Sequence, residues 1–283
     1  MLVDTGSFLS NERTAHGDVR ADAAAKNDLI LKAYDQFRVD VVNISAFDLG
    51  HISNLLKRDR WLSADPSSVS KRMVSANLVS DSSNLVAPPP FIVREIPTTA
   101  AGRSKLIKVA FIGLAESSPD VPRGLKVVDP AEAARRVVPR ARQLADVVVV
   151  LAHGKVAEVV EVARAALGAD VVIAGTGDMF TPPLRVGPTL VAFTPFESRL
   201  LGELRFFRDA QGKFSIRTRY ISLDESLGDD PIGAKTAAEV SDAGLTVFKE
   251  NQKLLADWLV LSRTRDPKRR NLSPPEEGAA TLV

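Results

Sequence analysis

A run of six residues, Asp146–Leu151, limits what this chain can fold into more than any other stretch. Its four consecutive valines and closing leucine are apolar, whereas a strand with one solvent-facing side alternates apolar and polar residues. A strand of this kind must be covered on both faces. Helical patterns over Asp129–Leu144 and Val156–Leu167 flank the run, and a second apolar strand, Asp170–Ile173, follows. This order predicts an α/β sheet with layers on both sides.

The start of the helix at Asp129–Leu144 can be read from its first residues. Asp129 is suited to the N-cap position, and Pro130 to the first helical position, where its missing N–H costs nothing. Glu132 lies three residues after the cap, as in a capping box. We therefore expect the Asp129 side chain to cap this helix.

Strands and helices alternate early in the chain, whereas strands follow one another late. Phe91–Ile96 and Leu106–Leu114 are predicted to pair as a hairpin across the turn at 98–103. The other predicted elements are helices at Ala23–Gln36, Leu49–Arg58 and Ala234–Leu261, and strands at Val39–Ile44, Val74–Leu78, Thr189–Thr194, Leu201–Arg208 and Phe214–Leu223. We predict one α/β domain, residues 1–262, built as a four-layer α/β/β/α sheet sandwich. Residues 263–283 are polar and are predicted to form a disordered tail.

Composition excludes several function classes. The chain has no cysteine, which rules out disulfides, thiolate metal sites and cysteine nucleophiles. Its net charge is +2, too balanced for a nucleic-acid-binding protein, although a short basic run lies at 263–270. No apolar run reaches the roughly 18–20 residues that a transmembrane helix needs.

The first residues, Met1–Gly6, have neither the basic segment nor the apolar stretch of a signal peptide. By default this predicts a soluble, cytoplasmic protein. They look instead like the end of a strand that runs into a turn. We therefore expect an N-terminal truncation or a misassigned start, with the first strand of the domain missing.

Several segments in order resemble the metallophosphatase domain of the 5′-nucleotidase family, the calcineurin-like phosphoesterases. They are Leu2–Leu9, Val39–Gly50, Ser75–Leu78, Val109–Leu114, Val149–Gly154 and Asp170–Gly175. The resemblance covers roughly residues 1–260 and implies the four-layer fold named above. It also implies hydrolysis of nucleotides or other phosphoesters by two metal ions about 3.5–4 Å apart, which activate water and clamp the phosphoryl oxygens. The family is often exported.

Two metal-ligand positions and one catalytic position of the family carry other residues in the first third of this chain. The family's first Asp-x-His would lie upstream of Met1. Ser7 stands where the family has a metal-bridging Asp, and Ser45-Ala46-Phe47-Asp48 aligns with its Gly-Asn-His-Glu segment. The resemblance therefore implies that Ala46 replaces an Asn ligand and Phe47 a catalytic His. An apolar ring is unfavourable beside a hydrated, charged metal centre.

The later ligand positions are only partly kept. His153 matches a family His ligand, but the Gly-His-x-His motif is Gly175-Thr176-Gly177-Asp178 here. Asp178 could still bind a hard cation through oxygen, and Thr176 is a poor substitute. The resemblance thus implies, at most, one divalent ion, Mn²⁺, Zn²⁺ or Mg²⁺, and not a complete binuclear site.

The remnant metal-ligand candidates are His153, Asp178 and Asp48. Each has a structural alternative. His153 could be a hydrogen-bonded histidine at the rim of the core, Asp178 a turn residue, and Asp48 the cap of the helix that begins near Leu49.

Two functions remain open on the sequence. One is a 5′-nucleotidase-like phosphoesterase with impaired or lost catalysis, whose partner is a nucleotide or phosphoester. The other is a non-catalytic scaffold that binds a ligand or a protein.

Overall fold

We describe the protein from a computed structural model. It describes residues 1–10, 12, 20–100, 103–118, 121–176, 182–194, 200–209, 214–224, 226–228, 230–231, 233–235 and 238–239. The chain divides into two compact units. The first consists of Met1–Phe8 and Arg38–Gly228, and the second of Leu9–Phe37 and Asp229–Val283. Each unit is described by itself.

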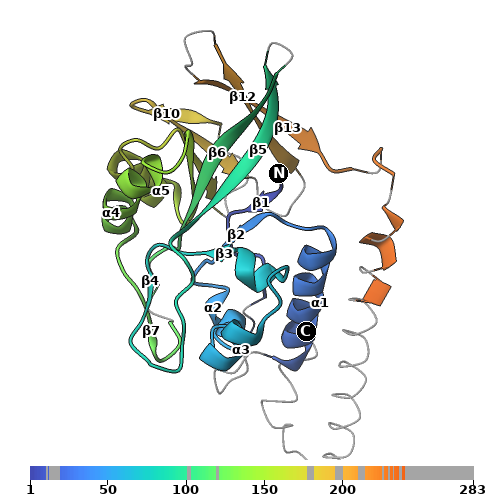
Figure 1. The fold of residues 1–283 in the computed structure, drawn as a ribbon. Helices are drawn as coiled ribbons and strands as arrows, with labels where there is room; N and C mark the ends of the chain where they lie inside the picture. Colours follow the sequence, from blue (N-terminus) through green and yellow to red (C-terminus); the bar gives the residue numbers. More distant parts are fainter. Residues whose placement is uncertain are drawn as a thin grey trace, which may run out of the picture. The chain divides into compact units, whose positions relative to one another are not determined.

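A six-stranded sheet forms the centre of the first unit (Figure 1). Its strand order is β10-β11-β9-β8-β6-β5, and the four inner strands are parallel. The strands are β5 (Phe91–Ala100), β6 (Arg103–Leu114), β8 (Val147–His153), β9 (Val171–Gly175), β10 (Leu184–Val186) and β11 (Thr189–Thr194). The antiparallel β5–β6 pair is the predicted hairpin.

Alternate residues of β8 face two different cores. Val148 and Val150 pack in a cluster with helices α4 (Pro130–Arg142) and α5 (Val156–Ala165). Val149 and Leu151 belong to a second cluster on the other face. All four side chains are at most 2% exposed, so the strand is buried on both faces, as its unbroken apolar run predicts.

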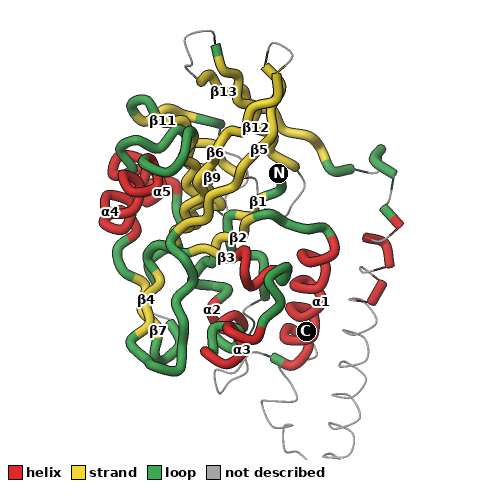
Figure 2. Tube along the Cα trace, viewed as in Figure 1, coloured by secondary structure: helices red, strands yellow, loops and turns green. Residues whose placement is uncertain are grey.

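The second cluster joins the large sheet to a smaller one. Val41 and Val74 of the smaller sheet pack there with Val109 and Phe111 of β6. This sheet is parallel, in the order β1 (Val3–Asp4), β2 (Val41–Asn43), β3 (Met73–Val74). The β12–β13 ribbon (Leu200–Arg208, Phe214–Ser222) packs Phe206 and Phe214 against the same cluster. The predicted α/β fold with a sheet sandwich is confirmed, with helices α4 and α5 outside the larger sheet (Figure 2).

Several predicted elements differ in extent. The predicted helix Leu49–Arg58 is two short helices, α2 (Leu49–Ile52) and α3 (Arg58–Ser63), followed by the 3-10 turn η1 (Val69–Arg72). The antiparallel pair β4 (Leu78–Ser80) and β7 (Leu125–Val127) includes one strand, β7, that was not predicted, and β10 was also missed. Only the first residues of the predicted helix at 234–261 are described. The boundary at residue 262 and the tail lie outside the described residues and stay predictions.

The predicted strand Val74–Leu78 is interrupted by a buried amide. Asn77 Nδ2 donates to the carbonyl oxygens of Ala115 and Val128, at 2.7 and 3.0 Å, and its Oδ1 accepts from the Ala115 N–H at 2.9 Å. These bonds satisfy a fully buried polar side chain. They hold Asn77 between the end of β3 and the start of β4.

The second unit contains helix α1 (Ala21–Gln36), close to the predicted Ala23–Gln36. The buried Asn27 side chain exchanges hydrogen bonds with Ser10, at 2.8 Å in each direction. Lys32 Nζ lies 2.7 Å from Glu239 Oε2. In neither unit do the described helices include one long and apolar enough for a bilayer crossing.

The predicted cap of α4 is present, and it can be tested. Asp129 Oδ1 accepts from the Glu132 N–H at 2.6 Å. Asp129→Ala should therefore lower the free energy of unfolding by about 1 kcal/mol, measured by urea denaturation. Asp129→Ser, which keeps a capping oxygen, should recover most of the loss. An equal loss in both variants would contradict the cap.

Candidate functional site

The carboxyl ends of strands from both sheets meet in the first unit. Asn43 makes the connection: its Nδ2 donates to Thr5 O, just after β1, at 2.8 Å and to Leu114 O, at the end of β6, at 2.9 Å. Gly175, which ends β9, lies so near Thr5 and His153 that an added Cβ would be 2.6 Å from Thr5 Oγ1 and 3.1 Å from His153 Cδ2. Ligand sites of α/β proteins commonly form at such strand ends.

We call this group the strand-end cluster. It consists of Thr5–Ser7, Ser45–Asp48, Glu116, His153 and Gly175.

Asp48 organises one side of the strand-end cluster. Its side chain is fully buried, and Oδ2 accepts three hydrogen bonds: from Ser7 N at 2.8 Å, from Ser45 N at 3.0 Å and from Ser45 Oγ at 2.7 Å. The prediction that Asp48 caps the following helix is wrong. Asp48 occupies the N-cap position of α2, but its side chain makes no capping bond, because it turns back to the preceding loop.

Ser7 is held in an unusual backbone conformation. Its φ is +64°, in the left-handed region that residues with a Cβ seldom adopt. The preceding turn is closed by Asp4, whose Oδ1 accepts from Gly6 N at 2.7 Å, and Ser7 N is held by Asp48. These two carboxylates therefore fix the path of the chain after β1.

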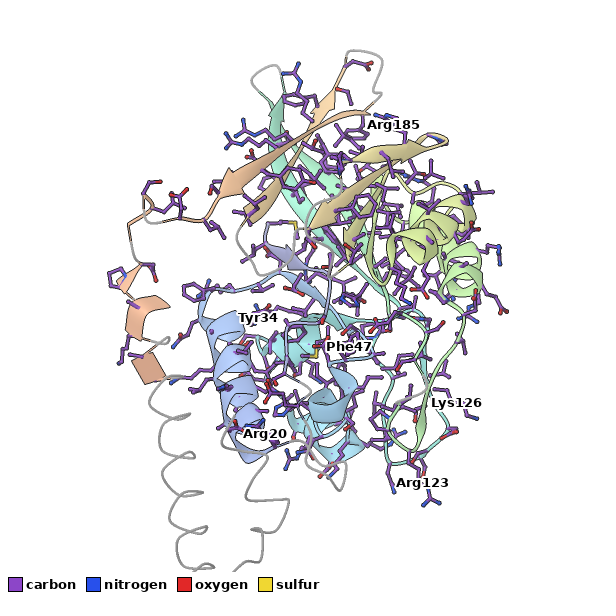
Figure 3. All side chains as sticks on the ribbon, turned by 180° about the vertical axis from the view of Figure 1, so that it is seen from behind. Arg20, Tyr34, Phe47, Arg123, Lys126 and Arg185 are labelled. Atoms are coloured by element: carbon purple, nitrogen blue, oxygen red, sulfur yellow. The ribbon has the colours of Figure 1, made fainter. Side chains whose placement is uncertain are left out.

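His153, the residue that matches a family His ligand, ends β8 inside the strand-end cluster. Its side chain is 11% exposed, and Nδ1 lies 3.1 Å from Glu116 Oε2. The ring of Phe47 meets the imidazole edge-on, with centroids 5.9 Å apart and planes at 84°. Phe47, whose side chain is labelled in Figure 3, is 50% exposed. The two aligned positions, Phe47 and His153, are thus brought into contact.

Glu116 was missed on the sequence. It lies two residues after the end of β6, its side chain is 9% exposed, and Oε1 accepts from Ala46 N at 3.1 Å. The available signal was a carboxylate two residues after the end of an apolar strand. No spacing to another polar residue distinguished it from a surface residue of the loop.

The structure brings only some of the predicted residues together. Asp48 and His153 both lie in the strand-end cluster, and Thr176 follows β9. Asp178 and Gly177 lie outside the described residues. The metal-binding role predicted for His153, Asp48 and Asp178 stays a prediction.

Comparison with known proteins identifies the fold. Neither protein-family models nor curated proteins match the sequence. Among solved structures, a 5′-nucleotidase precursor from Thermus thermophilus matches with a TM-score of 0.64 and 17% identity, over 86% of this chain and 49% of that one. The sulfate thiohydrolase SoxB of Thermus thermophilus matches with a TM-score of 0.60 and 18% identity, over 86% and 42%.

A shorter protein matches over nearly its whole length. The calcineurin-like phosphoesterase YfkN from Bacillus subtilis has a TM-score of 0.55 and 16% identity, over 87% of this chain and 96% of that one. This chain spans about half or less of the two Thermus proteins. The similarities show a shared fold, that of the 5′-nucleotidase-type metallophosphoesterases.

Proposed function

We propose that this chain, which has the 5′-nucleotidase-type metallophosphoesterase fold, is a 5′-nucleotidase-like domain in which metal-dependent phosphoester hydrolysis is impaired or lost. The observation that carries the proposal is the use of Asp48. Its Oδ2 accepts three hydrogen bonds from Ser7 and Ser45, so the carboxylate holds the loops together. An oxygen that already accepts three hydrogen bonds is a poor metal ligand, and this holds for Asp48 Oδ2.

The donor set supports the same proposal. A two-metal centre needs several ionised or imidazole side chains that converge on the ions. In the described part of the chain, no three His, Asp or Glu side chains come together in a way that could hold a metal ion. Ser7, Ala46 and Phe47 lie beside Asp48 without an ionisable group. The described residues do not fit a two-metal centre, and we derive no hydrolytic step through one.

A binding role without turnover is the second candidate, and Phe47 favours it. Half of this aromatic side chain is exposed beside His153, where a planar or apolar group could pack on it. The ligand would be a nucleotide or other phosphoester, the class of molecule for which two of the three similar proteins are named, or a protein surface.

The proposal predicts that the purified chain does not hydrolyse 4-nitrophenyl phosphate or AMP faster when Mn²⁺ or Zn²⁺ is added. Phosphate release should stay at the level of a protein-free blank, because most metal-ligand positions of the family carry other residues here. The 5′-nucleotidase of Thermus thermophilus, assayed in parallel, serves as the positive control. Titration calorimetry should detect no Mn²⁺ binding tighter than about 1 mM.

One outcome of the same assay would contradict the proposed loss of hydrolysis. Saturable hydrolysis that EDTA abolishes, and that His153→Gln lowers at least about tenfold, would show a working metal centre and overturn the proposal.

A further inference from the structure

We infer that Glu116 and His153 form a buried carboxylate–imidazole pair that takes over, by direct contact, the role of a metal ion at the strand ends. The inference rests on the proposed loss of the two-metal centre and says what has replaced it. A metal bound at strand ends ties several strands together through its ligands. Here the side chain of Glu116 makes those connections. The resemblance to the family gave this residue no role.

Glu116 connects three strand ends. It follows β6, its Oε1 accepts from Ala46 N after β2 at 3.1 Å, and its Oε2 lies 3.1 Å from His153 Nδ1 at the end of β8. The bond to Ala46 crosses from the larger sheet to the smaller one. The carboxylate therefore joins the two sheets and two neighbouring strands of one sheet.

The buried carboxylate of Glu116 needs a partner that compensates its charge. A buried carboxylate is costly unless a positive or hydrogen-bonding group compensates it. Glu116 Oε2 and His153 Nδ1 are both buried, and neither has a well-aligned hydrogen bond within the described residues. The two atoms are 3.1 Å apart, so a proton on His153 Nδ1 lies where it can be donated to Glu116 Oε2 and compensate the carboxylate.

Two glycines and one aromatic ring lie close to the pair. An added Cβ at Gly154 would lie 3.5 Å from Glu116 Cβ, and one at Gly175 would lie 3.1 Å from His153 Cδ2. The two glycines thus seat the two side chains closely. Phe47 covers the imidazole from the side with its ring.

A double-mutant cycle with thermal unfolding tests the pair. Glu116→Gln and His153→Gln should each lower the melting temperature by about 5–10 °C, since each leaves a buried partner uncompensated. The double variant should lose clearly less than the sum of the two single losses. Glu161→Gln is the matched control: it removes a carboxylate paired with Arg164 on the surface of α5, and it should shift the melting temperature by no more than about 2 °C.

Metal addition separates the pair from a metal site. EDTA or 1 mM Mn²⁺ should leave the wild-type melting temperature unchanged within about 1 °C. Additive losses in the cycle would overturn the pair and leave the proposed loss of hydrolysis standing. A Mn²⁺-induced rise that both single variants abolish would overturn it too, because Glu116 and His153 would then be metal ligands. Metal-dependent hydrolysis by the wild type would instead overturn the proposed function, whatever the coupling.

Discussion

Replacing Asp48 with alanine should lower the free energy of unfolding by roughly 3–5 kcal/mol. The carboxylate is fully buried, and the three hydrogen bonds to its Oδ2 come from two backbone N–H groups and one hydroxyl. Without it, the buried N–H and hydroxyl of Ser45 lose their acceptor, and each unsatisfied buried donor costs about 1–3 kcal/mol. Ser7 also loses the bond that holds its left-handed backbone. Urea denaturation measures the loss.

Asp48→Asn is the matched control. It keeps the size of the side chain and one acceptor oxygen, so it should lose only about 1–2 kcal/mol, the difference between charged and neutral hydrogen bonds. Both losses should be the same in EDTA and in Mn²⁺, because the partners of Asp48 Oδ2 are protein groups. If Asp48→Ala were as stable as the wild type in EDTA and weaker only in Mn²⁺, Asp48 would be a metal ligand instead.

The parts of the fold that could be predicted depend on local patterns. The apolar run at Val147–Leu151 indicates a strand buried on both faces, and Asp129 with Pro130 indicates a helix start, because both signals are contained within a few residues. Strands β7 and β10 were missed because each has only three residues with a charged one in the middle, whereas the equally short β2 lies in a β-branched run. The break at Asn77 depends on Ala115 and Val128, which are distant in sequence.

The candidate site was harder to predict than the fold, because its contacts join residues that are distant in sequence. His153 was singled out because it matches a His ligand of the family, and it ends the apolar strand β8. Asp48 was interpreted as a helix cap because its neighbours in sequence begin a helix, whereas its bond to Ser7 spans 41 residues. Glu116 could not be identified, since its contacts to Ala46 and His153 exist only after the two sheets have packed.

Gly113→Ala should be at least as damaging as the loss of Asp48, with a loss of about 3 kcal/mol or more. An alanine Cβ at this position of β6 would lie 2.4 Å from Val74 O and 2.5 Å from Asn43 Oδ1. Neither oxygen can move freely. Val74 O accepts from Ile44 N at 3.2 Å, and the Asn43 amide is held by its bonds to Thr5 and Leu114.

Gly202→Ala tests whether this effect comes from the approach of the two sheets. Gly202 also lies in a strand, β12, but its added Cβ would make only ordinary contacts, at 3.7 and 4.0 Å, with the Tyr220 ring. Its free energy of unfolding should change by no more than about 1 kcal/mol in either direction. Equal losses at both positions would indicate a general cost of alanine in these strands. A loss confined to Gly113 would mean that the smaller sheet must approach β6 to within contact of its backbone, and this approach is what brings Ala46 within hydrogen-bonding distance of Glu116.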